Sequence, residues 1–264
     1  MGFFKKGRQE FIWMTTDTFL LILNSNRHPV AEVHILISDF AFYGKIAEKW
    51  NAKNDMTHFE YGNPKSTNVL IQMVDDHDLS VIENEVNVVK EKAGDDFCLI
   101  AVKVDDWNRD LSPWRAPAVF GGEAFGGGAE KTLAKVISEL NDQRKKYYIG
   151  GYSLAGLFAL WAAYQTDVFK GVAAASPSVW FPGFTEYMDE HVIKSRTVYL
   201  SLGDRESKAR NPVTATVGER IQRAYSTLTG RGINCILEWN EGNHFRDADK
   251  RTAKAFAWVM KNSL

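Results

Sequence analysis

The sequence has little cysteine, no excess of either charge and no long apolar run. Two of its 264 residues are cysteines, Cys98 and Cys235, and each lies in an apolar, strand-like segment. Buried reduced thiols are therefore expected, and a disulfide or a cysteine metal site is disfavoured. The net charge is −1 and no basic block is present, which argues against nucleic-acid or membrane-surface binding as the main function.

Targeting and membrane-spanning signals are also missing. No apolar run is long enough to cross a bilayer, and the opening Met-Gly-Phe-Phe-Lys-Lys leads into neither a long apolar segment nor a small-residue cleavage site. It also lacks the Ser or Thr of a myristoylation signal. We find no internal repeat and no linker rich in Pro, Gly or Ser. The expectation is a single domain over residues 1–264, located in the cytoplasm, with no membrane partner.

What the chain does contain is a regular alternation of apolar runs and amphipathic segments after residue 53. Such runs predict strands, and the spacing of the segments between them predicts helices. Together they indicate a mostly parallel sheet covered by helices on both faces, an α/β fold. Earlier in the chain, the runs at 18–24 and 31–38 predict an antiparallel pair. The later strands are expected at 68–74, 97–104, 147–149, 171–175, 197–202 and 234–239, and the helices at 79–93, 129–140, 157–163, 213–228 and 250–260, with a further helix ending near 192.

The most informative segment is Gly-Tyr-Ser-Leu-Ala-Gly at residues 151–156, between an apolar run and a helical segment. A serine on a glycine-flanked turn from strand to helix is typical of the nucleophile elbow of α/β-hydrolases. The strained turn needs small neighbours, and Gly151 and Ala155 are small, although the motif usually has glycine at the second of these positions. The alternative is a turn whose serine only caps the helix. Residues downstream of Ser153 favour the elbow.

A serine nucleophile needs a histidine base and a carboxylate that orients it, and in α/β-hydrolases the chain order is serine, acid, histidine. Two histidines follow Ser153. His191 lies in a polar helical segment, which is typical of a solvated residue, whereas His244 follows the last expected strand, where the base belongs. The acid is expected after the preceding strand. Glu206 is favoured because it lies three residues beyond the glycine that ends that strand, and Asp204 is the alternative.

An oxyanion hole needs two backbone N–H donors. The amide of Leu154, at the N-terminus of the helix after the nucleophile, is the first expected donor. The second is expected from the loop after the strand at 68–74, at Asp76 within Asp-Asp-His-Asp (75–78). Ionised carboxylates only accept hydrogen bonds, so these side chains are expected to face away or to engage cationic or backbone partners. A metal site here is the less favoured alternative, because adjacent loop acids usually are solvated or cap a helix.

Aromatic residues are expected to shape the substrate pocket. Trp107 and Trp114 lie in a loop that follows a strand end, where they suit an acyl or aromatic group of a substrate or, alternatively, anchor the loop on the core. Three glycines at 126–128 precede a helix without the Gly-Lys-Ser or Gly-Lys-Thr of a phosphate-binding loop. A hinge or close packing is therefore the favoured interpretation of these glycines.

Four segments together resemble one esterase family of the α/β-hydrolases, which includes the enterochelin esterase and esterase D relatives. They are the elbow at 151–156, Ala-Ser-Pro-Ser-Val-Trp-Phe at 175–181, Gly-Asp-Arg-Glu at 203–206 and Gly-Asn-His-Phe at 242–245. The resemblance covers about the second half of the chain, from residue 145 onward. The Ser-Pro-Ser-x-Trp segment is its most specific part, and Trp180 from this segment is added to the expected pocket. The family often has glycine where this chain has Asp76.

The resemblance implies an α/β-hydrolase fold and a serine carboxylesterase that needs no cofactor. Ser153 is the implied nucleophile, His244 the base and Glu206 or Asp204 the acid. The expected partner is a small-molecule ester, with no nucleic acid, no membrane and no metal, and homo-oligomer formation is left open. An acyltransferase or thioesterase on the same scaffold is one alternative, and a catalytically weak, hydrolase-like binding protein is the other.

Overall fold

The computed structural model describes residues 2–6, 9–13, 20–21, 56–140 and 142–263. The chain divides into two compact units, residues 1–44 and 45–264, and the expectation of one domain over the whole chain stays a prediction. In the first unit, β1 (Gly2–Lys6) pairs antiparallel with β2 (Gln9–Trp13), which pairs antiparallel with β3 (Leu20–Leu21). β3 lies in the run expected at 18–24. The expected partner run at 31–38 lies outside the described residues.

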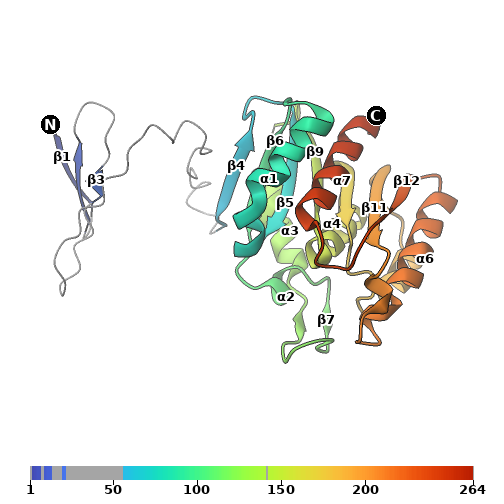
Figure 1. Ribbon diagram of the computed structural model, residues 1–264. Coiled ribbons are helices and arrows are strands. Elements are labelled where there is room, and N and C mark those ends of the chain that lie inside the picture. The colour runs from blue at the N-terminus through green and yellow to red at the C-terminus, as the bar shows by residue number, and fades with distance from the viewer. Residues whose placement is uncertain (1, 7–8, 14–19, 22–55, 141, 264) are drawn as a thin grey trace. The chain divides into compact units, whose positions relative to one another are not determined.

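The second unit is built on a seven-stranded sheet with the strand order β12-β11-β10-β9-β5-β6-β4 (Figure 1). All neighbouring strands are parallel except β4, which pairs antiparallel with β6 at one edge. The six parallel strands match the expected apolar runs. β4 was not expected because its five residues contain no continuous apolar run, although polar and aromatic side chains alternate along it. The strands are β4 (His58–Gly62), β5 (Asn68–Val74), β6 (Cys98–Lys103), β9 (Lys146–Tyr152), β10 (Phe169–Ala175), β11 (Thr197–Gly203) and β12 (Asn234–Asn240).

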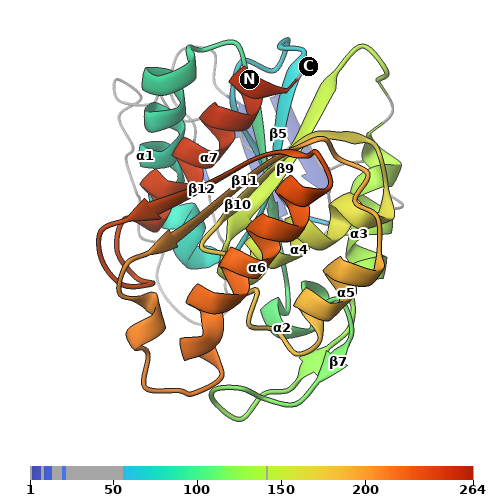
Figure 2. The same ribbon diagram turned by 90° about the vertical axis from the view of Figure 1, so that its right-hand side faces the viewer.

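Helices cover both faces of this sheet (Figure 2). The alternation of side chains along β5 explains the two layers. Leu70 and Val74 belong to the hydrophobic cluster that contains residues of α1 and α7, whereas Ile71 and Met73 belong to the cluster that contains residues of α3, α4 and α6. The mostly parallel sheet with helices on both faces, predicted from the sequence, is confirmed. The main helices are α1 (Asp76–Ala93), α3 (Ala129–Glu139), α4 (Ser153–Gln165), α5 (Phe184–Glu190), α6 (Val217–Gly230) and α7 (Ala248–Asn262). None of the helices in the described part of the chain is both long and apolar enough to cross a membrane.

α4 positions the elbow rigidly because it is buried on every side. All of its residues from Leu154 to Tyr164 are buried, so the helix has no polar face and lies within the core. Its first residue is Ser153, which directly follows the last residue of β9. The packing of a central strand and a buried helix therefore fixes the direction in which the serine leaves the sheet.

Smaller elements frame the carboxyl ends of the strands. α2 (Trp107–Asp110) follows β6, and a two-stranded ribbon joins β7 (Arg115–Ala116) to β8 (Phe125–Gly126). A Cβ added at Gly126 would lie 2.6 Å from Arg109 Cγ, and one at Gly128 would lie 2.7 Å from the Arg109 carbonyl oxygen. The glycines at 126–128 thus let two backbone segments approach closely, which confirms the packing interpretation.

A buried acid–amide pair links β5 to α1. Gln72 Nε2 donates a hydrogen bond to Glu85 Oε2 at 3.2 Å, and both side chains are buried. Within the described residues, Gln72 Oε1 and Glu85 Oε1 have no hydrogen-bond partner. Burial raises the pKa of Glu85 well above its ordinary value, with the nearby charges of Asp78 and Asp249 adding to the rise and the bond from Gln72 opposing it. The protonated acid is therefore the favoured form of Glu85 in the folded chain.

Glu85→Gln is expected to raise the thermal unfolding temperature at pH 8 by a few degrees, and by less at pH 5. The pKa of Glu85 is higher in the folded chain than in the unfolded chain. Its contribution to the free energy of unfolding is therefore complete below the pKa of the unfolded state and is lost as pH rises through the pKa of the folded state. Glutamine has no charge to bury and escapes that loss. Thermal melts at both pH values check the prediction, with Glu83→Gln, on the exposed side of the same helix, as the control. An equal gain at the two pH values would contradict it.

Candidate active site

Ser153 occupies a strained position between β9 and α4. Its φ of +56° is one that few residues other than glycine adopt, and this conformation lifts the hydroxyl away from the chain. A Cβ added at Gly151 would lie only 2.6 Å from the Cβ of Ala155. The turn is therefore so tight that the first position must be glycine, while the fifth accepts a methyl group. The departure from the usual motif at Ala155 leaves the elbow intact.

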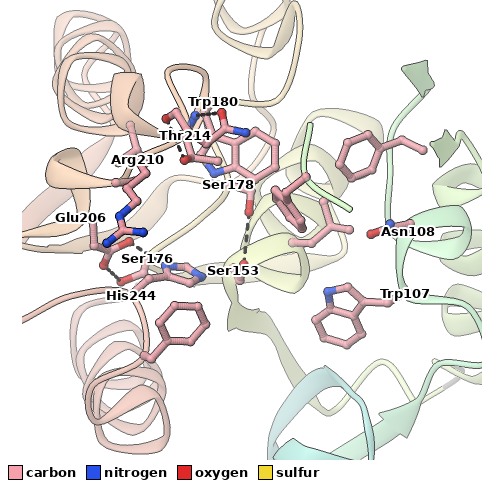
Figure 3. A pocket seen from close by; sticks show the side chains of 17 residues that line it. Trp107, Asn108, Ser153, Ser176, Ser178, Trp180, Glu206, Arg210, Thr214 and His244 are labelled. Carbon is pink, nitrogen blue, oxygen red and sulfur yellow. Dashed lines mark hydrogen bonds and ion pairs between the residues drawn. The ribbon is translucent and has the colours of Figure 1, made fainter. Parts of the chain in front are cut away.

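The three predicted residues meet at the carboxyl ends of three parallel strands. His244 Nε2 lies 2.9 Å from Ser153 Oγ, and His244 Nδ1 lies 2.7 Å from Glu206 Oε2 (Figure 3). Ser153 follows β9, Glu206 lies in a 3-10 turn (Glu206–Lys208) after β11, and His244 follows β12. The Glu206 side chain is 4% exposed and that of His244 is 31% exposed. The geometry joins a nucleophile, a base and a buried carboxylate into one hydrogen-bonded chain.

Glu206 is held by donors on the oxygen that faces away from His244. Its Oε1 accepts hydrogen bonds from the Gly203 amide at 2.7 Å, the Ser176 hydroxyl at 2.8 Å and Arg251 Nη1 at 3.1 Å. Burial works against ionisation, but the hydrogen bond and charge of His244, together with the Gly203 and Ser176 donors, hold the pKa of Glu206 below its usual value. The carboxylate is thus ionised and fixed in position to orient the imidazole.

Asp204, the alternative acid, has a different place in the structure. Its side chain is 52% exposed, and its Oδ1 accepts a hydrogen bond from the Gly242 amide at 2.8 Å. Two backbone hydrogen bonds run alongside, from the Asp204 amide to the Asn240 carbonyl and from the Arg205 amide to the Gly242 carbonyl. Asp204 therefore ties the turn after β11 to the loop that carries His244, and it does not contact the imidazole.

Sequence reasoning missed a buried arginine behind this site. Arg251 on α7 is 2% exposed. Its Nη1 donates to Tyr152 Oη at 3.0 Å as well as to Glu206, and its Nη2 donates to the Glu241 and Asn243 carbonyls at 3.0 and 3.2 Å. The Tyr152 hydroxyl in turn donates to the His244 carbonyl at 2.8 Å. One cation thus fixes both the acid and the histidine loop.

The sequence did carry a signal for Arg251. Arg251 lies one helical turn before Ala255 and two turns before Val259, so it is on the core-facing side of α7. A charged side chain is rarely buried in such a position unless it is paired.

The segment after β10 closes over the elbow. The Ser178 hydroxyl lies 3.3 Å from the Ser153 hydroxyl, and the Ser178 amide donates to the Ser153 carbonyl at 3.0 Å. Ser176, which binds Glu206, has a φ of +41°. The Ser-Pro-Ser-x-Trp motif thus contacts both ends of the hydrogen-bonded chain.

The loop position expected for Asp76 was wrong, whereas its role as the second oxyanion donor stays a prediction. Asp76 is the first residue of α1, not part of a loop, because Asp75 caps the helix in a reciprocal capping box with Asp78. Asp76 Oδ1 accepts a hydrogen bond from Lys103 Nζ at 2.6 Å. The three carboxylates therefore engage cationic and backbone partners, as their chemistry required. However, Leu154 lines the cavity at Ser153 and Asp76 does not, so the role given to Asp76 has no support in the lining of the cavity.

Asp76→Gly is expected to change ester hydrolysis less than threefold, and excess chelator is expected to leave it unchanged. The Asp76 side chain is 83% exposed, and an exposed ion pair such as its contact with Lys103 contributes little. In the described part of the chain, no three or more His, Cys, Asp or Glu side chains are grouped to hold a metal. Rates measured with and without chelator, for both proteins, check the prediction. Activity that falls with chelator and returns with a divalent cation would contradict it.

A cavity of about 450 Å³ opens at Ser153. Trp107 and Trp180 line it, as expected, but Trp114 does not. The Trp114 indole donates to the Pro182 carbonyl at 3.0 Å and packs against Phe181 and Tyr187, with ring centroids 5.5 and 5.4 Å away, so it anchors the loop on the core. The lining residues are Trp107, Asn108, Phe120, Phe125, Ser153, Leu154, Ser176, Ser178, Trp180, Glu206, Ala209, Arg210, Asn211, Thr214, Val217, His244 and Phe245.

Solved structures share this fold at low sequence identity. An IroE-like serine hydrolase from Shewanella oneidensis is 14% identical with a TM-score of 0.63, and the alignment covers 78% of this chain and 76% of that one. The siderophore hydrolase EstA from Aspergillus nidulans is 17% identical with a TM-score of 0.56, covering 84% and 99%. The enterobactin esterase FES from Shigella flexneri is 13% identical with a TM-score of 0.54, covering 78% of this chain and 55% of that one.

These similarities confirm the expected α/β-hydrolase fold, and the resemblance inferred from the sequence motifs agrees with them. Neither a protein-family model nor a curated protein matches the chain.

Proposed function

We propose that this protein is a serine hydrolase that cleaves carboxylic esters of small molecules through an acyl-serine intermediate. The observation that carries the proposal is the hydrogen-bonded chain from Ser153 through His244 to Glu206, with distances of 2.9 and 2.7 Å, at the wall of a cavity. The names of the structures that share the fold, a serine hydrolase, a siderophore hydrolase and an enterobactin esterase, support the same reaction class.

In the acylation step, His244 Nε2 takes the proton from Ser153 Oγ as this oxygen attacks the ester carbonyl carbon. The ionised Glu206 stabilises the imidazolium that forms and keeps Nδ1 protonated. The oxyanion of the tetrahedral intermediate develops beside the Leu154 amide, at the positive end of α4, where first-turn N–H groups have no partner within the helix. Collapse of the intermediate breaks the ester C–O bond, and His244 gives its Nε2 proton to the departing alcohol.

In the deacylation step, water replaces the alcohol in the cavity. His244 Nε2 removes a proton from this water as its oxygen attacks the acyl carbon. The second tetrahedral intermediate collapses, the bond to Ser153 Oγ breaks, and His244 returns the proton to the serine. The carboxylic acid leaves, and the chain regains its starting state. Every proton in both steps moves through His244, which makes its contacts with Ser153 and Glu206 the core of the mechanism.

The test compares hydrolysis of an ester, hydrolysis of a thioester and transfer to an added alcohol, all with the same acyl chain. We expect release of free acid from 4-nitrophenyl esters, with a kcat/KM higher than for the matching acyl thioesters, and little transfer to an added alcohol. Faster thioester cleavage, or transfer that exceeds hydrolysis, would favour the thioesterase or acyltransferase alternative. A folded protein without turnover on any of these compounds would favour the binding protein.

A further inference from the structure

We propose that the ester cleaved at Ser153 carries an anionic group, such as a carboxylate, which Arg210 binds at the wall of the cavity. The inference rests on the proposed function and names the class of ester that this chain prefers. Arg210 acts as a specificity residue, which touches the substrate away from the reacting carbonyl.

Arg210 is well placed for this role. It lines the same cavity as Ser153 and His244 and comes from the loop between two 3-10 turns, Glu206–Lys208 and Thr214–Thr216. Figure 3 shows its side chain on the same side of the cavity as Glu206 and His244, across from Trp107 and Asn108. An anionic group bound there would lie in the same cavity as the nucleophile, within one small molecule.

The loop that carries Arg210 is anchored at the next residue. Asn211 Oδ1 accepts hydrogen bonds from the Val213 amide at 2.9 Å and the Thr214 amide at 3.3 Å, which closes a turn. Asn211 Nδ2 donates to the Val119 carbonyl at 2.5 Å, in the segment that leads to Phe120 on the cavity wall. The backbone next to Arg210 is thus held in place at the cavity that this residue lines.

The charge of Arg210 is not neutralised by the described part of the chain. No carboxylate oxygen of the described residues lies within 4.0 Å of its guanidinium, whereas Arg205, Arg220 and Arg223 all have such partners. Glu206, the carboxylate in the same cavity, is already bound by Arg251 and His244. A guanidinium that has no carboxylate partner among the described residues matches the two oxygens of a substrate carboxylate. The charge-assisted hydrogen bonds between the two groups are stronger than those that a neutral side chain could offer.

The rest of the cavity surface is mainly apolar, which indicates that the rest of the ligand is apolar too. Trp107, Phe120, Phe125 and Trp180 supply aromatic surface, and Phe120 and Trp180 contact each other with ring centroids 5.6 Å apart. One cation among aromatic walls fits an ester with an apolar skeleton and a single negative charge. A neutral ester of the same size would gain the apolar contacts and leave the guanidinium to solvent.

The experiment uses matched pairs of esters on the full chain. In the first arm, 4-nitrophenyl monoesters of dicarboxylic acids with four to eight carbons are compared with neutral analogues in which the distant carboxylate is a primary amide. In the second arm, the butyrate ester of 3-hydroxybenzoate is compared with that of 3-hydroxybenzamide. The readout is the ratio of kcat/KM for the anionic ester to that for the neutral one, and the two arms place the anion on the acyl or the alcohol side.

Arg210→Gln is expected to lower this ratio by about 10- to 100-fold in one arm, with neutral esters changed less than threefold. Arg210→Lys should restore part of the ratio because it keeps the charge but not the planar fork. Lys208→Gln, in the 3-10 turn that precedes this loop and away from the cavity lining, is the matched control and should leave the ratio unchanged. The preference of the wild type should also weaken in high salt.

Two results would overturn the inference while leaving ester hydrolysis standing. One is an anionic-to-neutral ratio that Arg210→Gln does not change in either arm. The other is an equal loss in Lys208→Gln, which would assign the preference to the diffuse charge of the loop. Failure of the wild type to hydrolyse the neutral and anionic esters alike would instead remove the proposed function, and this inference with it.

Discussion

Replacing Ser153 by alanine is expected to lower kcat/KM for 4-nitrophenyl butyrate by at least ~10³-fold. Alanine keeps the small size that the elbow needs but removes the oxygen that His244 Nε2 approaches at 2.9 Å. Without that oxygen no acyl-enzyme forms, and the remaining rate reflects only binding and the oxyanion donor. The acyl-serine mechanism makes this one of the largest effects expected of a single substitution.

The measurement needs evidence that the variant is folded, because the residue sits on a strained turn. Far-UV circular dichroism and a thermal melt supply it, and Ser226→Ala, on the exposed side of α6, is the control for loss of a serine hydroxyl. A folded Ser153→Ala protein that keeps more than a tenth of the wild-type rate would remove Ser153 from the mechanism.

The second large effect is expected at Glu206. Glu206→Gln should lower kcat by roughly 10²- to 10⁴-fold, because a neutral amide cannot stabilise the imidazolium and presents the wrong hydrogen-bonding group to His244 Nδ1. Asp204→Asn should cost less than tenfold, since the remaining amide oxygen can still accept from the Gly242 amide. The two substitutions each remove one charge from the same turn, so each is the control for the other.

Stability must be separated from catalysis at Glu206. The substitution also leaves the buried Arg251 without its carboxylate, and breaking a buried ion pair costs about 3–5 kcal/mol. Rates should therefore be compared at a temperature at which both variants are folded, as judged by their thermal melts. A larger loss in Asp204→Asn would transfer the acid role to Asp204. Full activity in both variants would indicate a Ser153–His244 dyad.

The parallel core and the main site could be predicted because their signals lie along the chain. Buried parallel strands are continuous apolar runs, and residues that follow such runs meet at one edge of the sheet. This reasoning predicted that Ser153, Glu206 and His244 lie together, and the structure brings them within hydrogen-bonding distance although nearly 40 residues separate the last two along the chain. The spacing from Gly203 also favoured the acid that the structure places against the imidazole.

Other features depend on contacts between distant segments and could not be predicted. Whether a loop tryptophan enters a cavity or packs on the core depends on its neighbours. The Trp114 indole donates a hydrogen bond to the Pro182 carbonyl and packs against the Phe181 ring. The apolar spacing predicted that α1 begins at Leu79, but the helix begins at Asp76 because Asp75 and Asp78 form a capping box at its N-terminus. The burial of Arg251 depends on five hydrogen-bond partners in other segments of the chain.

The most direct test of the account is labelling of the intact protein with a fluorophosphonate, which reacts only with an activated serine. Mass spectrometry of the whole chain and of its peptides shows how many labels bind and where. We expect one phosphonate per chain, on the peptide that contains Ser153, formed in step with the loss of ester hydrolysis and absent from His244→Gln. A folded protein that takes up no label, or one labelled at another residue while hydrolysis continues, would contradict the acyl-serine mechanism.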